Sequence, residues 1–385
     1  MTLQRTIDIL DQLIAFPTVS RDSNLDLIAF VKDFLARLGI EAAIIHDEAG
    51  TKANLYAVLG PAEIPGVMVS GHTDVVPTEG QAWSTDPFRM AKRGDLLYGR
   101  GTADMKGFIA CVLALVEENA TRRLNRPLHL AFSYDEEVGC IGVRRLIDHM
   151  AASATTPALC IVGEPTSMRT VIAHKGKLAG RISCTGHECH SSHAPDGLNA
   201  IHLATDMVSH LRNLQDEIRA NGRHDDDFEI PFTTVHVGTI HGGTALNIVP
   251  RDCVLDFEIR SLPSDNPEPL LDRIRENADR LAATARARFP QASVSVDITN
   301  EYPSLNTAPD DRAVETVTRL TGVNSLGKIA FGTEGGLFRQ RLGIPTVVCG
   351  PGDIRQAHKP DEFVATDQLA ACNTMLSRLI DQLAV

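Results

Sequence analysis

Short, almost continuous apolar runs, each ended by glycine, proline or a polar turn, are the feature of this sequence that most restricts its fold. Five such runs are Asn54–Gly60, Val67–Gly71, Leu128–Ser133, Ala158–Gly163 and Thr346–Gly350. Strands that are buried on both faces read in this way, because neither face needs polar residues. Helical patterns lie at Gly107–Asn119 and Val143–Met150, and apolar spacing predicts two earlier helices at 2–15 and 24–38. The alternation predicts an α/β fold whose sheet has a substantial parallel portion.

The middle of the chain has a different order of elements. From about Lys177 the pattern predicts strand, helix, strand, strand, helix and strand, at 178–185, 199–218, 232–240, 245–260, 267–287 and 292–299. This βαββαβ order is typical of ferredoxin-like domains. The α/β pattern resumes afterwards. We therefore expect a ferredoxin-like α+β domain at 177–298, inserted into a discontinuous larger domain formed by 1–176 and 299–385.

Composition indicates a globular chain and argues against a nucleic-acid binder. The 385 residues are 43% hydrophobic and carry 37 Lys and Arg against 49 Asp and Glu, which gives a formal charge of −12. These values are typical of a globular chain. An acidic chain with no basic run, one Trp and four Tyr is not expected to bind nucleic acid, whose affinity comes mainly from contacts with phosphates.

The N-terminal segment and the cysteines indicate the compartment. Residues 1–16 are amphipathic and lack the apolar centre of a signal peptide, and no later run is long enough to span a bilayer. The eight cysteines form no C-x-x-C pair, so buried reduced thiols are expected rather than thiolate zinc or redox sites. We expect a cytoplasmic protein without membrane contact.

Residues that bind metals or transfer protons follow the predicted strands. They are His72 and Asp74 after the second run, Asp104 before the 107–119 helix, Asp135, Glu136 and Glu137 after the third run, Glu164 after the fourth and His358 after the fifth. Ligands of open α/β sheets bind beyond the carboxyl ends of the strands. Each residue alone has a plainer interpretation, such as a helix cap or a solvated turn. Together, two histidines and several carboxylates without thiolates form a set that suits zinc or a similar divalent ion.

The spacing of these residues suggests a different role for each of them. His72 and Asp74 are two positions apart, so on an extended backbone Asp74 can accept the N–H of a metal-binding imidazole. Glu136 and Glu137 are adjacent; if Glu137 binds metal, Glu136 is free to act on a water. One carboxylate, best represented by Asp104, could bridge two metals about 3.5–4 Å apart.

The ordered set of motifs resembles a known family, the dinuclear zinc amidohydrolases and peptidases. This family includes acetylornithine deacetylases, succinyl-diaminopimelate desuccinylases, aminoacylases and carboxypeptidase G. The matching segments are SGHTDVVP (70–77), GRGTADMKG (99–107), DEEVG (135–139), VGEPT (162–166), CHSSHAPDGLNAI (189–201), GGTALNIVP (242–250), FEIRSLP (257–263), FGTEGG (331–336) and AHKPDE (357–362). The resemblance implies a zinc-peptidase-like catalytic domain with an inserted lid and dimerisation domain, and therefore a homodimer.

Position by position, the resemblance implies roles for the strand-end residues. His72 and Glu164 are expected to hold one Zn²⁺, His358 and Glu137 the other, and Asp104 to bridge them, with Co²⁺ as a possible substitute for zinc. Asp74 resembles the partner that orients His72. Glu136 resembles the general base and acid, which takes a proton from water and passes it to the leaving amine.

Four further residues are assigned through the same motifs. His190 matches a histidine that in several relatives reaches across the dimer to the oxyanion, and such a donor is worth about 2.7–4 kcal/mol. Arg260, at the end of FEIR, matches a position that binds the substrate carboxylate, although a structural ion pair is the alternative. Asn247 could contact the substrate or the oxyanion. Glu334 would repel a carboxylate and could receive a cationic side chain instead.

Within the family, the acetylornithine deacetylases are most similar to this chain. The resemblance lies in the HKG tract (174–176), the HSSHAPDGLNA stretch (190–200) and the segments around 331–336 and 349–363. This resemblance implies hydrolysis of N2-acetyl-L-ornithine to ornithine and acetate, a step of arginine biosynthesis. The alternatives are succinyl-diaminopimelate desuccinylase, a broader N-acyl-amino-acid hydrolase, and a catalytically inactive binding protein of the same fold. A dinucleotide enzyme is disfavoured because no G-x-G-x-x-G follows the early strands.

Overall fold

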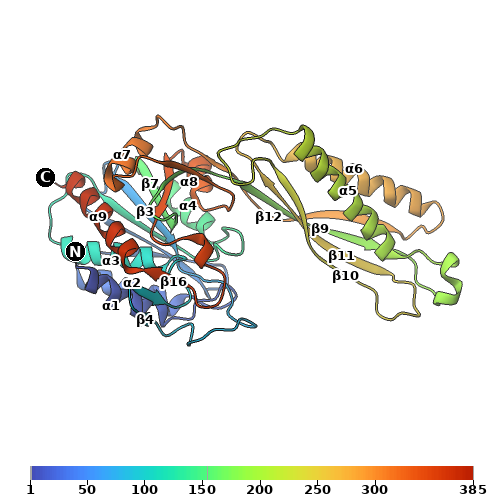
Figure 1. Cartoon of the computed structure of the whole chain (residues 1–385), viewed down its shortest axis with the longest axis horizontal. Coiled ribbons are helices and arrows are strands. Elements are labelled where there is room, and N and C mark those ends of the chain that lie inside the picture. Colours follow the sequence, from blue (N-terminus) through green and yellow to red (C-terminus); the bar gives the residue numbers. More distant parts are fainter. Residues whose placement is uncertain (1, 154, 385) are drawn as a thin grey trace. The chain divides into compact units, whose positions relative to one another are not determined.

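The computed structural model describes residues 2–153 and 155–384, which form two compact units (Figure 1). The first unit comprises residues up to 173, 305–328 and 333 onward, and the second comprises 174–304 and 329–332. The boundaries expected from sequence, 177 and 298, fall inside the second unit. Along the chain, its first strand begins at Gly176 and its last strand ends at Tyr302, so the unit continues slightly beyond both expected boundaries.

A mixed sheet forms the centre of the first unit. In the described residues it has nine strands, in the order β1 (Ala42–His46), β2 (Ala53–Leu59), β6 (Leu128–Ser133), β3 (Val67–His72), β7 (Leu159–Pro165), β15 (Thr346–Gly350), β8 (Thr170–His174) and β13 (Leu305–Asn306), with β14 (Leu326–Ile329) paired to β8. The five apolar runs are five of these strands. The α/β class is confirmed.

Parallel pairing within this sheet places four strand ends together. β3 is parallel to β6 and to β7, and β15 is parallel to β7, whereas β2 is antiparallel to both β1 and β6. The expected parallel portion is therefore confirmed. Because parallel strands point the same way, the carboxyl ends of β3, β6, β7 and β15 lie at one edge of the sheet.

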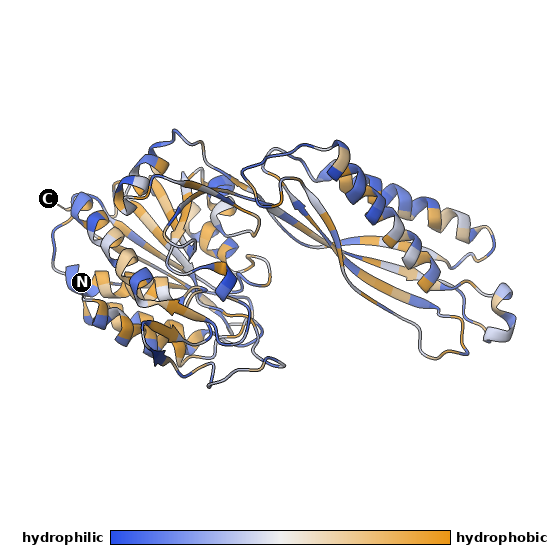
Figure 2. Cartoon of the chain, in the orientation of Figure 1, coloured by the Kyte–Doolittle hydropathy of each residue, from blue (hydrophilic) through white to orange (hydrophobic). Residues whose placement is uncertain are grey.

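Helices cover both faces of the sheet, which explains why its strands are almost wholly apolar (Figure 2). A Cβ on Gly71 of β3 would meet Met105 and Ile109 at the start of the neighbouring helix, whereas Ser70 contacts Glu334 ahead of another. Adjacent strand residues point to opposite faces, so these helices lie on opposite sides. The helices of this unit are α1 (Leu3–Ile14), α2 (Leu25–Arg37), α3 (Lys106–Asn119), α4 (Val143–Ala151), α7 (Arg312–Thr321), α8 (Gly335–Leu342) and α9 (Thr366–Leu383).

A small antiparallel sheet and a short helix complete the first unit. The sheet has the order β16 (Phe363–Ala365), β5 (Leu96–Tyr98) and β4 (Ala91–Arg93), and the 3-10 turn η2 spans Ile354–Gln356. β16 thus joins the segment after His358 to the segment before Asp104 through backbone pairing.

The second unit is a four-stranded antiparallel sheet with two helices. Its strands are β9 (Gly176–Thr185), β10 (Thr234–Gly242), β11 (Asp252–Ser261) and β12 (Ser293–Tyr302), in the order β10-β11-β9-β12. Helices α5 (Ala200–Asn221) and α6 (Glu268–Arg286) pack on the sheet, and η1 spans Ser191–Asp196. Burial alternates along β9 and β11, as expected when one face is covered. The βαββαβ order and ferredoxin-like strand arrangement agree with the expectation from sequence.

One strand of this unit is shorter than its sequence suggests. The apolar pattern predicts a strand at 245–260, but β11 begins at Asp252 and the residues before it form a loop. Gly243 has φ 78°, and Pro250 has no N–H with which to continue the ladder. The apolar side chains of Leu246 and Ile248 are exposed on this loop rather than packed in a sheet.

No helix in the described part of the chain is both long and apolar enough to cross a bilayer. All eight cysteines are free, and seven of them are buried; Cys189 is partly exposed.

Candidate metal centre

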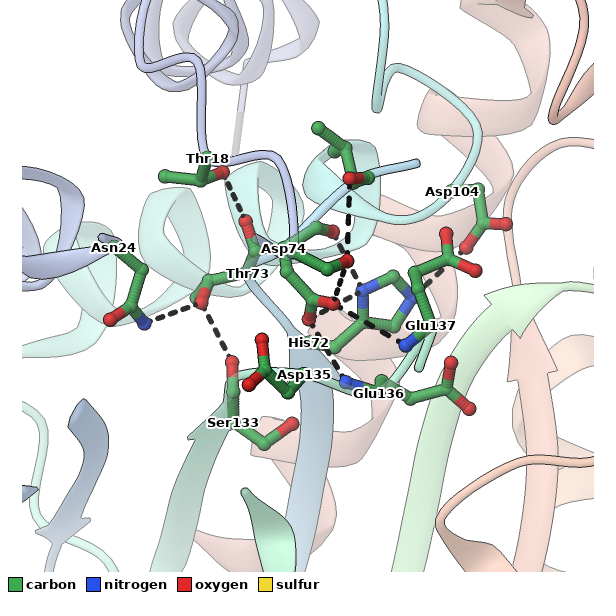
Figure 3. A network of polar contacts seen from close by, with 12 residues as sticks. Thr18, Asn24, His72, Thr73, Asp74, Asp104, Ser133, Asp135, Glu136 and Glu137 are labelled. Atoms are coloured by element: carbon green, nitrogen blue, oxygen red, sulfur yellow. Dashed lines mark hydrogen bonds and ion pairs between the residues drawn. The ribbon is translucent and has the colours of Figure 1, made fainter. Parts of the chain in front are cut away.

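The parallel edge of the sheet carries the residues that the sequence singles out. His72 is the last residue of β3, Glu164 lies near the end of β7, and Glu136 and Glu137 follow β6. Asp104 lies just before α3, and His358 lies in the loop after β15. Asp104 is not the cap of α3, which is Met105, so the alternative interpretation as a helix cap is not supported. Figure 3 shows His72 with Asp104 and the carboxylates of the 135–137 segment around it.

Asp104 lies between the two histidines. Its Oδ1 is 3.0 Å from His72 Nε2, and its Oδ2 is 3.1 Å from His358 Nε2. Each histidine also approaches one glutamate: Glu164 Oε1 is 3.7 Å from His72 Nε2, and Glu137 Oε2 is 3.1 Å from His358 Nε2. The cluster thus consists of two histidine–glutamate pairs that share one aspartate.

Possible ligand atoms converge in two overlapping groups. In one, atoms of His72, Glu136 and Glu164 all lie within 4.8 Å of one another; in the other, atoms of His72, Asp104 and Glu137 do so. Glu136 therefore lies close enough to the centre to act on something bound there. His72, Asp104 and Glu164 are at most 5% exposed, whereas the His358 side chain is 49% exposed, which leaves one side open.

The backbone carbonyl of Asp74 orients His72. His72 Nδ1 lies 2.9 Å from this oxygen and 3.6 Å from the nearest carboxylate oxygen of Asp74. A carbonyl only accepts, so Nδ1 donates and the lone pair of a neutral imidazole is on Nε2, toward Asp104 and Glu164. The sequence predicts that the side chain accepts this N–H; the shorter contact is made by the main chain.

The Asp74 carboxylate instead holds the 136–137 segment. It accepts the backbone N–H groups of Glu136 at 3.2 Å and Glu137 at 3.3 Å, and the hydroxyl of Ser20 at 2.7 Å (Figure 3). Lys52 supports the same turn through an ion pair of 2.5 Å with Asp135, which has φ 53°. Ser20 and Lys52 cannot be found from the sequence, because they are distant along the chain and carry no motif signal.

The electrostatics show a concentration of negative charge. Burial and the neighbouring Asp104 carboxylate raise the pKa of Glu137 to about 7, and burial together with Asp104 raises the pKa of Glu164 well above its usual range. Burial also raises the pKa of Glu136, with Glu137 adding to the effect. In contrast, although burial opposes it, contact with Glu164 and Asp104 raises the pKa of His72.

This pattern fits a cation-binding centre. In the described residues, no lysine or arginine forms an ion pair with Glu137, Glu164 or Asp104. Burying several carboxylates without a compensating cation is unfavourable. Imidazole nitrogens and carboxylate oxygens without thiolates form a donor set suited to Zn²⁺ and similar divalent ions. The residues present therefore fit a divalent metal centre.

Glu334 is a further buried carboxylate whose charge acts on residues of this cluster. It precedes α8, is 1% exposed, and its Oε2 accepts a hydrogen bond of 3.4 Å from Ser70 on β3. Among the residues that the structure describes, its other carboxylate oxygen has no hydrogen-bond partner. Burial raises its pKa to about 7. The Glu334 charge also contributes to the raised pKa of Glu136.

The other three residues singled out by the sequence belong to the second unit. His190 Nδ1 accepts the backbone N–H of Ser192 at 3.2 Å, so the ring N–H of a neutral His190 is on Nε2. Asn247 is exposed, and its carbonyl accepts the N–H of Ser191 at 3.0 Å, which places these two loops together. Arg260 lies on β11, with its Nε 3.0 Å from Glu258 and Nη1 3.2 Å from the hydroxyl of Tyr302.

Comparisons with known proteins show the family of this chain. The model of peptidase family M20/M25/M40 matches residues 68–382. Acetylornithine deacetylase of Pasteurella multocida is 35% identical over 96% of both chains, and that of Shigella sonnei is 34% identical over 97% of this chain and 96% of its own. Among solved structures, the M20 family metallo-carboxypeptidase Sso-CP2 of Sulfolobus solfataricus has a TM-score of 0.79 at 17% identity, covering 97% of this chain and 98% of its own. The chain belongs to peptidase family M20/M25/M40.

Proposed function

We propose that this chain hydrolyses the amide bond of N2-acetyl-L-ornithine, releasing L-ornithine and acetate, and so serves arginine biosynthesis. Curated relatives from Pasteurella multocida, Photorhabdus laumondii, Proteus mirabilis and Shigella sonnei are acetylornithine deacetylases, at 34–35% identity over 96–97% of this chain. The observation that carries the proposal is the shared aspartate, Asp104, whose two oxygens face one histidine each. That geometry suits a pair of metals acting on one amide.

Two Zn²⁺ ions are the proposed cofactors, with Co²⁺ as a substitute. His72 and Glu164 would hold one ion, His358 and Glu137 the other, and Asp104 both. A bound metal pair would polarise the amide carbonyl and favour deprotonation of water. The pairs of atoms measured above, 3.0–3.7 Å apart, support this division of ligands.

Glu136 is the proposed general base and acid. Its carboxylate converges with His72 and Glu164, while its backbone is held by Asp74. From this position Glu136 would accept a proton from water and deliver it to the amine that leaves as ornithine. Its neighbour Glu137 points toward His358, so the adjacent glutamates serve different purposes.

Substrate recognition is proposed for four residues. Arg260 would bind the α-carboxylate, Glu334 would attract the side-chain ammonium of ornithine, and Asn247 with His190 would contact the acyl oxygen. The proton on Nε2 of a neutral His190 makes it a donor, as that role requires. Arg260 already contacts Glu258, so binding a carboxylate there involves a change of partner. Glu334→Gln should raise the KM for acetylornithine but not for N-acetylmethionine; equal changes would contradict its role.

We also propose that the protein acts as a homodimer through its second unit. β10 is an edge strand of the sheet, and the loop after it exposes Leu246 fully, with Ile240 and Ile248 at 43% and 38% exposure. Exposed apolar side chains beside an unpaired edge are typical of a surface that a second copy covers.

The experiment that tests the function is a substrate panel. We would compare kcat/KM for N2-acetylornithine, N-succinyl-diaminopimelate and N-acetylmethionine, with metal content measured on the same sample. We expect acetylornithine to be the best of the three. A preference for either other substrate would replace the proposed specificity, and no hydrolysis of any by the metal-loaded protein would favour the binding-protein alternative.

A further inference from the structure

A buried ion pair joins the two loops that present Asp104 and His358. Arg100 and Glu362 are each about 1% exposed at the side chain, and Arg100 Nη1 donates to Glu362 Oε2 at 2.7 Å. Glu362 lies four positions after His358, and Arg100 lies four positions before Asp104. The site described above makes no use of either residue.

The second oxygen of Glu362 binds the turn that carries Asp104. Glu362 Oε1 accepts the backbone N–H groups of Gly101 at 3.0 Å, Ala103 at 3.0 Å and Asp104 at 3.2 Å. The Glu362 carbonyl also accepts the N–H of Gly99 at 2.9 Å. One side chain thus holds three N–H groups, including that of the proposed bridging aspartate.

Arg100 extends the connection to the loop that carries His358. Its guanidinium donates to the carbonyl of Lys359 at 3.4 Å and to Gln81 Oε1 at 2.6 Å, and it lies over the ring of Trp83 at 5.0 Å. Gln81 in turn donates to the carbonyl of His358 at 3.2 Å. His358 has φ 61°, a conformation that a non-glycine residue seldom adopts unless its surroundings hold it there.

We propose that Glu362, acting with Arg100, is a positioning residue that sets the distance between Asp104 and His358 and thereby builds the metal site to which both belong. A buried ion pair does not by itself imply a stabilised fold, because the cost of desolvating the two charges offsets their attraction. Here the same carboxylate also fixes the backbone of one ligand and, through Arg100 and Gln81, that of the other. The inference rests on the proposed metal centre and not on the identity of the substrate.

The test compares metal binding by Glu362→Gln and the wild-type protein. Apoprotein would be titrated with Zn²⁺ against a competing chelator and with Co²⁺ while its absorption spectrum is recorded. We expect the metal affinity of the site that contains His358 to fall by about 10–100-fold, the range found when partners of metal ligands are removed. The Co²⁺ spectrum of that site should change as well. We also expect kcat for acetylornithine to fall with little change in KM.

Glu117→Gln is the matched control. Glu117 forms a two-pronged pair with Arg5, at 2.5 and 2.7 Å, between α1 and α3 and away from both ligand loops. Its loss should leave both metal affinities and the Co²⁺ spectrum unchanged. If Glu362→Gln does not fold, Gln81→Ala removes the contact with the His358 carbonyl without leaving a buried charge, and it should weaken the same site.

Wild-type zinc affinities and an unchanged Co²⁺ spectrum in folded Glu362→Gln, or in Gln81→Ala if only that variant folds, would overturn the proposal. So would an equal effect in Glu117→Gln, because the change would then reflect general destabilisation. Failure of the proposed function would give a different result. The wild-type protein would bind metal and Glu362→Gln or Gln81→Ala would bind it more weakly, but no protein in the series would hydrolyse acetylornithine.

Discussion

Asp74 acts mainly through the main chain of the 136–137 segment. Its carboxylate accepts two backbone N–H groups and the Ser20 hydroxyl. In Asp74→Asn, the side-chain NH₂ group would face one of these donors and could not accept its hydrogen bond. Asp74→Asn should therefore misplace Glu136 and Glu137 and reduce kcat or metal affinity by about 10–100-fold. Ser20→Ala, which removes one neutral contact, is the control. Equal activity of Asp74→Asn and the wild type would show that this network is dispensable.

Glu136 should be separable from the metal ligands by mutation. Glu136→Gln keeps the size of the side chain and its backbone hydrogen bond but cannot accept a proton. We expect kcat to fall by about 10²–10⁴-fold, the usual contribution of a general base, with metal content unchanged. Metal analysis and steady-state kinetics on one preparation check this. Wild-type turnover in metal-loaded Glu136→Gln would exclude its proposed role.

The buried imidazole of His129 should make the folding stability depend on pH. It is buried on β6, its Nδ1 lies 2.7 Å from the Tyr56 hydroxyl, and burial lowers its pKa from 6.5 to about 4. Between these values the unfolded chain binds a proton that the folded protein does not, so this contribution to stability is lost as pH falls from 6.5 toward 4. From pH 7 to 5, wild-type stability should fall by about 2 kcal/mol more than that of His129→Gln.

Urea unfolding of the wild-type protein and His129→Gln at pH 7 and 5, with a metal chelator present throughout, measures this difference in stability. Comparing the two proteins cancels the titration of other groups. A parallel fall in both stabilities would mean that His129 becomes protonated in the folded protein as easily as in the unfolded chain.

At the residue scale, the sequence predicts which side chains gather but not every contact among them. Strand-end position alone brings His72, Glu137 and Glu164 to one edge, because parallel strands end together. It does not reveal that a carbonyl rather than the Asp74 carboxylate is nearest to His72, since that depends on backbone dihedrals beyond β3. Glu362 and Arg100 are hidden for a different reason: an ion pair between residues 262 positions apart has no local pattern.

Among the elements, β7 and β15 approach so closely that only glycine fits between them. A Cβ on Gly350 would lie 2.0 Å from the carbonyl oxygen of Gly163 and 2.7 Å from that of Glu164. Both are backbone atoms, so the strands themselves would have to move. Gly350→Ala should lower the free energy of unfolding by about 1–3 kcal/mol and reduce metal content by displacing Glu164.

Gly238→Ala on β10 is the control for this substitution, because its Cβ would meet nothing within 4 Å. Its stability should change by less than about 0.5 kcal/mol. Urea unfolding and metal analysis of the two variants provide the comparison. Similar stabilities for both would mean that β7 and β15 separate at little cost.

The predictability of each element depends on how strongly it is buried. β3, β6 and α3 were predictable because nearly every side chain in them faces the core. The elements that the sequence analysis did not single out include β1, which is mostly half-buried, and the three-residue strands β4, β5 and β16. Short or half-exposed segments carry too few apolar residues to show a period. In the 245–251 loop the opposite error arises, because exposed apolar residues imitate a strand.

For the molecule as a whole, the inserted order of elements was predictable because it changes from α/β to βαββαβ and back along the chain. The association of chains cannot be predicted in this way, because it depends on the shape and chemistry of a surface and not on the periodicity of the sequence.

We predict a homodimer that Leu246→Asp shifts toward monomer, since Leu246 is fully exposed. Light scattering after size-exclusion chromatography measures this, with Glu229→Gln, an exposed position of the same unit, as control. A wild-type monomer would refute the proposal.

We propose that a pair of divalent metals at the edge of the sheet enables this chain to deacetylate acetylornithine. The most direct test is to strip the protein with a chelator, add Zn²⁺ stepwise, and follow bound zinc and ornithine release together. We expect no turnover in the stripped protein and full turnover when two zinc ions are bound per chain. Undiminished turnover by the metal-free protein, or zinc binding at two equivalents without any ornithine release, would contradict it.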